Sequence, residues 1–161
     1  MKGQSGINVA QELLKQAYKF HLEGNIDQAI HYYKLSIDVF PTAEAHTFLG
    51  WAYSLKGKYE SAIQECYVAI ELDREYGNPY NDIGSYLIEL GKYDKALPWL
   101  EKALNAERYP SKHFAYFNLG KLYEKKGNWK EAIDYYKKAL EYRPDYEIAK
   151  KNLYELMGRM N

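Results

Sequence analysis

The chain repeats one short pattern four times, and this repetition limits the folds that it can adopt. A glycine is followed two residues later by a large apolar residue and five residues later by an alanine, as in Gly57-Tyr59-Ala62. The glycines are 33, 34 and 36 residues apart, and a small residue lies seven positions before each one, giving the pairs Ala17 and Gly24, Gly50 and Gly57, Gly84 and Gly91, and Gly120 and Gly127. A period of this length predicts a stack of supersecondary units in place of a single globular core.

Each unit contains two helical patterns separated by its glycine. In the second unit, apolar residues at Ala45, Phe48, Leu49 and Ala52 follow helical spacing, and Gly57 then lies where a left-handed C-cap ends the helix. The same pattern predicts antiparallel helix pairs over 10–42, 43–76, 77–110 and 113–146.

Glycines inside predicted helices need a packing reason, because glycine costs about 0.5–1 kcal/mol there relative to alanine. Gly50, Gly84 and Gly120 lie in the middle of first helices. We expect them to allow close approach of the second helix of the same pair, with Ala62, Ala96 and Ala132 as the facing small residues.

The segments outside these pairs have predicted roles of their own. Residues 147–161 read as a capping helix that covers the last apolar face, in a pattern that begins at Asp145 and carries the stripe Ile148, Ala149, Leu153, Leu156 and Met157. Residues 1–9 are expected to be flexible. Two extra residues around Tyr109-Pro110-Ser111-Lys112 make a longer loop, which is a hinge, a contact loop or a tolerated insertion.

The composition argues against several classes of function. Lys and Arg number 22, as do Asp and Glu, so no net charge attracts the phosphates of nucleic acid. No stretch reaches the ~18 apolar residues of a membrane span, and the first residues do not resemble a signal peptide. With one cysteine, Cys66, the chain forms no internal disulfide, and we expect a cytoplasmic protein without membrane insertion.

Catalytic patterns are weak throughout. The four histidines share no metal-ligand spacing, and Cys66 falls at an inward helical position, as a small buried hydrophobe would. We therefore expect no enzyme activity, no catalytic residue, no cofactor and no metal. A further hypothesis is that the chain is a regulatory domain of a larger enzyme.

The residues of the repeat resemble the tetratricopeptide repeat, over about 10–146 and the capping helix. The fourth unit matches the family pattern best, with Leu119, Gly120, Tyr123, Gly127, Trp129, Ala132, Tyr136, Ala139 and Pro144. The resemblance implies an all-α, right-handed solenoid of four helix pairs whose first helices line a concave groove. It also implies a scaffold or adaptor that binds a protein or peptide partner and has no catalytic role.

In the family geometry, particular positions of the first helices face the groove. The predicted partner-binding residues are Leu14, Tyr18, His21, Thr47, Trp51, Asn78, Asn81, Ser85, Phe117, Asn118, Lys121 and Asn152. Trp51 follows Gly50 and so points away from the packed face; it either anchors a partner or packs against Tyr18 and the neighbouring turn.

Two binding modes of the family can be compared with these positions. Asn118 and Asn152 match an asparagine ladder that holds a peptide backbone, but Lys15, Phe48 and Asp82 interrupt it. The mode that grips a C-terminal carboxylate does not fit, because its positions in units one and two hold Leu14, Tyr18, Thr47 and Phe48.

A self-assembling structural module is the alternative function. Residues 1–112 carry 12 Lys and Arg against 15 Asp and Glu, whereas residues 113–161 carry 10 against 7. Opposite charge at the two ends could favour head-to-tail association into homo-oligomers, or it could reflect only a solvated, lysine-rich last repeat.

Overall fold

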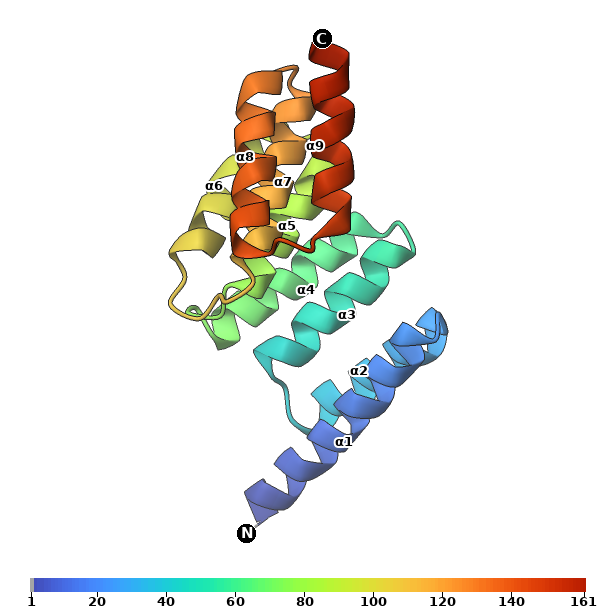
Figure 1. Ribbon diagram of the computed structural model, residues 1–161. Helices are drawn as coiled ribbons and strands as arrows, with labels where there is room; N and C mark the ends of the chain where they lie inside the picture. The colour runs from blue at the N-terminus through green and yellow to red at the C-terminus, as the bar shows by residue number, and fades with distance from the viewer. Residues whose placement is uncertain (1) are drawn as a thin grey trace.

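The computed structural model of the protein describes residues 2–161, which form nine α-helices. In chain order these are α1 (Lys2–Leu22), α2 (Ile26–Val39), α3 (Ala43–Leu55), α4 (Tyr59–Leu72), α5 (Asn78–Glu89), α6 (Tyr93–Asn105), α7 (Lys112–Lys125), α8 (Trp129–Tyr142) and α9 (Glu147–Met160). Figure 1 shows them as successive antiparallel pairs, with the two chain ends at opposite ends of the stack.

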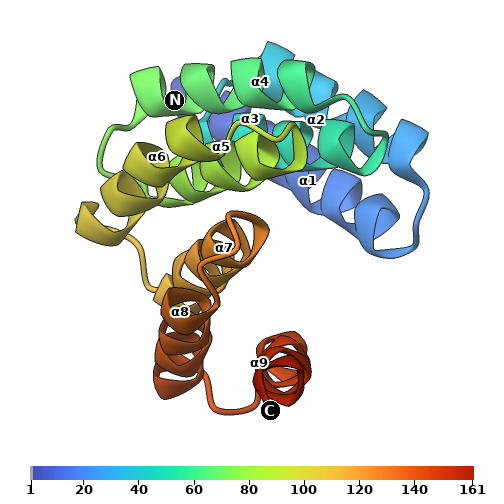
Figure 2. The same cartoon turned by 90° about the horizontal axis from the view of Figure 1, so that it is seen from above.

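Each helix packs mainly against its neighbours in the chain. The most extensive contacts join α1 to α2, α3 to α4, α5 to α6 and α7 to α8. The first helices of successive pairs also adjoin one another, and the stack follows a curve (Figure 2). The molecule is therefore an α-solenoid of four helix pairs followed by α9, as the repeat pattern predicted.

The turn inside each pair is built by its glycine. Gly24, Gly57, Gly91 and Gly127 have φ of +81°, +73°, +73° and +79°, a conformation that costs other residues free energy. After α3, the amide of Gly57 donates to the carbonyl oxygen of Ser54 at 2.9 Å, and that of Lys58 donates to Tyr53 at 3.0 Å. This is a Schellman motif, so the predicted left-handed C-cap is confirmed.

The glycines inside the first helices permit the close approach that was predicted. A Cβ atom at Gly50 would lie 2.9 Å from the carbonyl oxygen of Ala62, and one at Gly84 would lie 2.5 Å from Cδ2 of Leu100. At Gly120 it would lie 2.5 Å from Cδ1 of Tyr136. At all three glycines the nearest side chain belongs to the residue one helical turn beyond the predicted alanine, namely Cys66, Leu100 and Tyr136.

The first residues of the chain are helical. Residues 2–9, which were expected to be flexible, form the first turns of α1, so that prediction is wrong for them; Met1 lies outside the described residues. The buried hydroxyl of Ser36 on α2 donates a 2.7 Å hydrogen bond to the carbonyl oxygen of Ala10. Because this contact holds α1 near its start, residues before it need only helix propagation, which is easier than nucleation.

The last helix covers α8 with a narrower apolar face than the sequence predicted. Ala149, Leu153 and Leu156 are buried in a cluster with Tyr136, but Ile148 and Met157 are 48% and 38% exposed. The helix also begins at Glu147, two residues after the start of the pattern. In the described chain α9 packs mainly on α8, so only one side of it is covered.

The longer loop before α7 makes ordered contacts with the turn before α5. Tyr76 and Arg108 form an isolated parallel bridge, in which the amide of Gly77 donates to the carbonyl oxygen of Arg108 at 3.0 Å. The amide of Arg108 donates to Glu75 at the same distance, and its guanidinium pairs with Asp73. The loop was predicted to be a hinge, a contact loop or a tolerated insertion, and these hydrogen bonds favour a contact loop.

Candidate functional site

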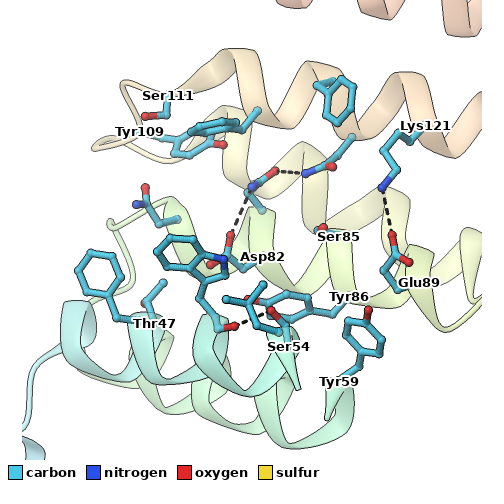
Figure 3. A pocket seen from close by; sticks show the side chains of 18 of the residues that line it. Thr47, Ser54, Tyr59, Asp82, Ser85, Tyr86, Glu89, Tyr109, Ser111 and Lys121 are labelled. Atoms are coloured by element: carbon cyan, nitrogen blue, oxygen red, sulfur yellow. Dashed lines mark hydrogen bonds and ion pairs between the residues drawn. The ribbon is translucent and has the colours of Figure 1, made fainter. Parts of the chain in front are cut away.

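A groove of about 510 Å³ lies on the side of the molecule where α3, α5 and α7 adjoin (Figure 3). Its apolar and aromatic lining consists of Phe48, Trp51, Leu55, Tyr59, Tyr86, Tyr109, Phe114, Phe117 and Tyr146. Its polar lining consists of Thr47, Ser54, Asn78, Asn81, Asp82, Ser85, Glu89, Ser111, Asn118 and Lys121. A cleft that combines large apolar and aromatic side chains with convergent polar groups is a usual form of a recognition site.

Most of the predicted partner-binding residues meet in this groove. Those that line it are Thr47, Trp51, Asn78, Asn81, Ser85, Phe117, Asn118 and Lys121. Those that do not are Leu14, Tyr18, His21 and Asn152. The groove is therefore formed mainly by α3, α5 and α7, and no residue of α1 lines it.

Residues of α1 support the groove from behind. The side chain of His21 is buried, its Nδ1 lies 2.9 Å from the hydroxyl of Tyr33, and burial lowers its pKa. Its ring lies 3.8 Å from that of Trp51, centroid to centroid. Tyr18 stays 40% exposed beside Phe48, with ring centroids 5.4 Å apart. Neither of these two predicted residues lines the groove: His21 lies buried behind Trp51, and Tyr18 lies exposed beside Phe48.

Leu14 and Asn152 are also used in packing. Leu14 packs against the buried cluster of α1, α2 and α3 that contains Tyr33. The amide of Asn152 on α9 lies 3.4 Å from the hydroxyl of Tyr136, which in turn lies 2.5 Å from a carboxylate oxygen of Glu124. Both residues were predicted in the groove, and both are instead engaged between helices.

Trp51 both lines the groove and packs against a neighbouring ring. The residue is half-buried and lines the groove, while its ring packs against His21 and lies 6.3 Å from that of Phe48. The packing partner is His21, and not Tyr18 as the alternative assumed. Trp51 is held in place from behind, so its groove side is pre-organised for contact with a ligand.

The asparagines of the groove bond to each other. The amide nitrogen of Asn118 donates to the amide oxygen of Asn81 at 2.9 Å, and both side chains are buried. Asn81 in turn places its amide nitrogen 3.4 Å from a carboxylate oxygen of Asp82. This chain of contacts crosses from α7 to α5 and fixes the polar side of the groove.

Three charged side chains line the groove, and they differ in their partners. The ammonium group of Lys121 pairs with Glu89 at 3.0 Å across α7 and α5. Asp82 is half-buried and has no ion pair within the described chain. Desolvation raises the pKa of Asp82 to about 7, opposed in part by the contact with Asn81.

Several groove residues were not among those predicted. Tyr109 and Ser111 come from the loop before α7, Tyr146 from the turn before α9, and Tyr86 from the packed side of α5. The extra length of the 109–112 loop was the one signal that could have pointed to this segment. A Cβ atom at Gly77 would overlap the side chain of Tyr109, so the absence of a side chain there lets the tyrosine reach the groove wall.

Outside the groove, the described residues give little indication of a reactive thiol, a metal site or a membrane-spanning helix. Burial raises the pKa of the Cys66 thiol, which is fully buried as predicted. No group of three or more His, Cys, Asp or Glu residues in 2–161 is arranged to hold a metal ion. Over the same residues, every helix is too short or too polar to span a bilayer.

Two family models described as tetratricopeptide repeat match the chain, over residues 23–76 and 75–145. The chain belongs to the tetratricopeptide-repeat (TPR) family. The groove described above therefore lies on the first-helix side of a TPR solenoid.

Similar proteins share this architecture in different settings. The BBSome complex member BBS4 of Bos taurus is 31% identical over 131 residues, which are 81% of this TPR chain and 25% of BBS4. The protein ycf37 of Guillardia theta is 37% identical over 117 residues, or 70% of this chain and 65% of ycf37. This chain thus spans only a quarter of BBS4.

Solved structures show the same fold. A crystal structure of MamA is 32% identical and superposes with a TM-score of 0.69, covering 84% of this chain and 78% of MamA. The pilF protein of Pseudomonas aeruginosa superposes with a TM-score of 0.86 at 20% identity, covering 97% of this chain and 71% of pilF. The second likeness shows the TPR fold alone.

Proposed function

We propose that this protein is a non-enzymatic interaction module that holds an extended segment or helix of a partner protein in the groove between α3, α5 and α7. The observation that carries the proposal is the aromatic groove itself. It combines half-buried Trp51, held from behind by His21, with polar groups on α5 and α7. Rigid aromatic anchors supply affinity at a low cost in side-chain entropy, and fixed polar groups supply orientation.

The similar proteins support an interaction role. By their names, BBS4 is a member of the BBSome complex, and a protein of Schizosaccharomyces pombe that is 27% identical over 121 residues is a subunit of the anaphase-promoting complex. Both names describe components of multiprotein assemblies. We infer that this chain also acts by binding other proteins.

Site-specific photo-crosslinking tests where a partner binds. A benzophenone side chain placed at Ser85 lies in the groove, whereas one placed at exposed Gln64 of α4 lies outside it. We expect crosslinks to a partner from position 85 in source-cell lysate and none to the same partner from position 64. The reverse result would move the binding surface to the outer face, and crosslinks only between copies of this chain would favour self-assembly.

A matched pair of tryptophan variants sharpens the test. Trp51→Ala removes the groove aromatic, and Trp129→Ala makes the same change on α8, where the side chain is 40% exposed outside the groove. With both variants folded by circular dichroism, we expect only Trp51→Ala to lose the partner. Equal retention by both variants would contradict a groove-bound partner.

A further inference from the structure

The charges inside the groove are not balanced. Glu89 is neutralised by Lys121 on the opposite helix, but within residues 2–161 Asp82 has only the amide of Asn81, at 3.4 Å. That amide belongs to a residue already bonded to Asn118. A carboxylate taken out of water without a cation is costly, so an unpaired half-buried one needs an explanation.

A second polar group in the groove also lacks a partner. The side chain of Tyr109 is 4% exposed and lines the groove, yet its hydroxyl has no hydrogen-bond partner in the described chain. Burial, and secondly the charge of Asp82, raise the pKa of this hydroxyl. The Asp82 carboxylate therefore lies near a second polar group without a side-chain partner, and the carboxylate itself can accept hydrogen bonds from a ligand.

Aromatic rings complete the surroundings of the carboxylate. Trp51, Tyr86 and Phe117 line the same groove, and Figure 3 shows Asp82 between the side that carries Thr47 and Ser54 and the side that carries Tyr109. A cation that enters such a site gains from the carboxylate and from the faces of the rings. A guanidinium suits it best, because it is planar, donates up to five hydrogen bonds and stacks on aromatic rings.

We propose that Asp82 binds a basic side chain, arginine in preference to lysine, of the partner segment held in the groove. This inference rests on the proposed function and adds the chemistry of the partner to it. The bound segment is thereby one with an arginine among apolar or aromatic neighbours.

The proposal predicts a pH dependence with a definite sign. Protons compete with the basic side chain for Asp82, whose pKa is about 7 in the free protein, so affinity rises with pH. If Asp82 is fully charged in the bound form, the affinity for the basic side chain rises about tenfold between about pH 6 and pH 8.

Other groups around Asp82 do not produce this change. The groups facing it are Cys66 of α4, Tyr86 and Glu89 of α5, Tyr76 and Tyr109 of the adjoining loops, and Lys121 of α7. The thiol and these three phenols have raised pKa values, and Glu89 and Lys121 are paired. His21 lies behind Trp51, outside the lining of the groove, and burial lowers its pKa.

Selection from a displayed library of short random peptides tests the proposal with the whole chain. We expect wild-type protein to enrich peptides with a basic residue beside apolar ones, in a manner that Trp51→Ala abolishes. Asp82→Asn should lose the basic preference, while Glu89→Gln, the matched change at the paired carboxylate, should keep it. Peptides that need Trp51 but show no basic preference would overturn this inference and leave the groove function standing. Failure to enrich any Trp51-dependent peptide would overturn both.

A double-mutant cycle on the best peptide measures the contact directly. Replacing its arginine by neutral citrulline should weaken binding to wild type about tenfold or more at about pH 8, yet barely affect binding to Asp82→Asn. The affinity of Asp82→Asn should not change between about pH 6 and pH 8. Equal losses in both proteins would place the arginine elsewhere and overturn the assignment.

Discussion

The two faces of α5 differ in how completely their groups are satisfied. Toward α6, Ile83 and Leu100 are fully buried, and a Cβ atom at Gly84 would overlap the side chain of Leu100. Toward the groove, Asp82 has a single long amide contact and the nearby Tyr109 hydroxyl has none in the described chain. The packed face accounts for stability, whereas the groove face retains polar groups that a ligand can satisfy.

The first and fourth helix pairs share their packing but differ in their contribution to the groove. Equivalent tyrosines, Tyr33 and Tyr136, are fully buried in both and bond to a side chain three residues before the turn glycine, His21 in one and Glu124 in the other. The packing frame is thus repeated, but only α7 of the fourth pair reaches the groove. The repeat sets where side chains pack, and the curvature of the stack sets which of them face the ligand.

The largest expected effect comes from filling the packed face. Gly84→Leu forces a side chain into Leu100, and we expect it to destabilise the fold by about 3 kcal/mol or more, or to unfold it. Gly158→Leu on α9 is the matched control, because outside its own stretch of helix no atom of the described chain lies within 4 Å of its Cβ position. Thermal unfolding followed by circular dichroism compares them, and a native-like midpoint for Gly84→Leu would refute the packing argument.

A smaller loss is expected where the packed and groove faces meet. Gly77→Ala introduces a methyl group against Tyr109, and we expect a loss of about 1–3 kcal/mol together with displacement of the loop before α7. Hydrogen exchange should then be faster at the amides of Gly77 and Arg108, which bond to each other's segments. Unchanged protection of both amides would show that the loop does not depend on this contact.

On the groove face, removing a charge should stabilise the protein. Folding raises the pKa of Asp82 from 3.8 to about 7, so the stability linked to its proton is present below pH 3.8 and lost as the pH rises through 7. We expect the free energy of unfolding of Asp82→Asn to exceed that of wild type by about 1–2 kcal/mol at about pH 8, after a discount for partial exposure. The difference should become smaller toward pH 4. Thermal unfolding across this range measures the trend; a pH-independent difference would exclude the carboxylate as its cause.

The smallest effects are expected from removing the hydroxyl groups of the equivalent tyrosines, Tyr33 and Tyr136. Tyr33→Phe leaves buried His21 without a hydrogen bond in the described chain, because its Nε2 already has no partner, and should cost about 1–1.5 kcal/mol. Tyr136→Phe leaves Glu124 without its tyrosine partner. Because Glu124 is partly exposed and water can hydrate it, we expect a smaller loss of stability. Urea unfolding of the two variants ranks them, and the opposite order would mean that Glu124 depends on its tyrosine more than His21 does.

Much of the fold could be predicted because its signals are local. The Gly57 turn needs a positive φ that few residues besides glycine adopt readily, and the apolar spacing before and after it is helical whatever lies elsewhere. Gly84 was also recognisable, since a glycine in mid-helix implies close contact. The candidate site was predicted only in part, because helical position says which way a side chain points but not what lies opposite it.

By itself, the sequence determined the period, the helix pairs, the glycine caps and the small residues between helices, since each depends on backbone conformation or on contact within one pair. Only the tertiary structure decided that His21 supports Trp51 from behind, that Tyr109 crosses Gly77 into the groove, and that Asp82 has no cation beside it in the part of the chain that the structure describes. These features arise where separate pairs meet, and the curvature that brings them together is a sum of small rotations that no single repeat contains.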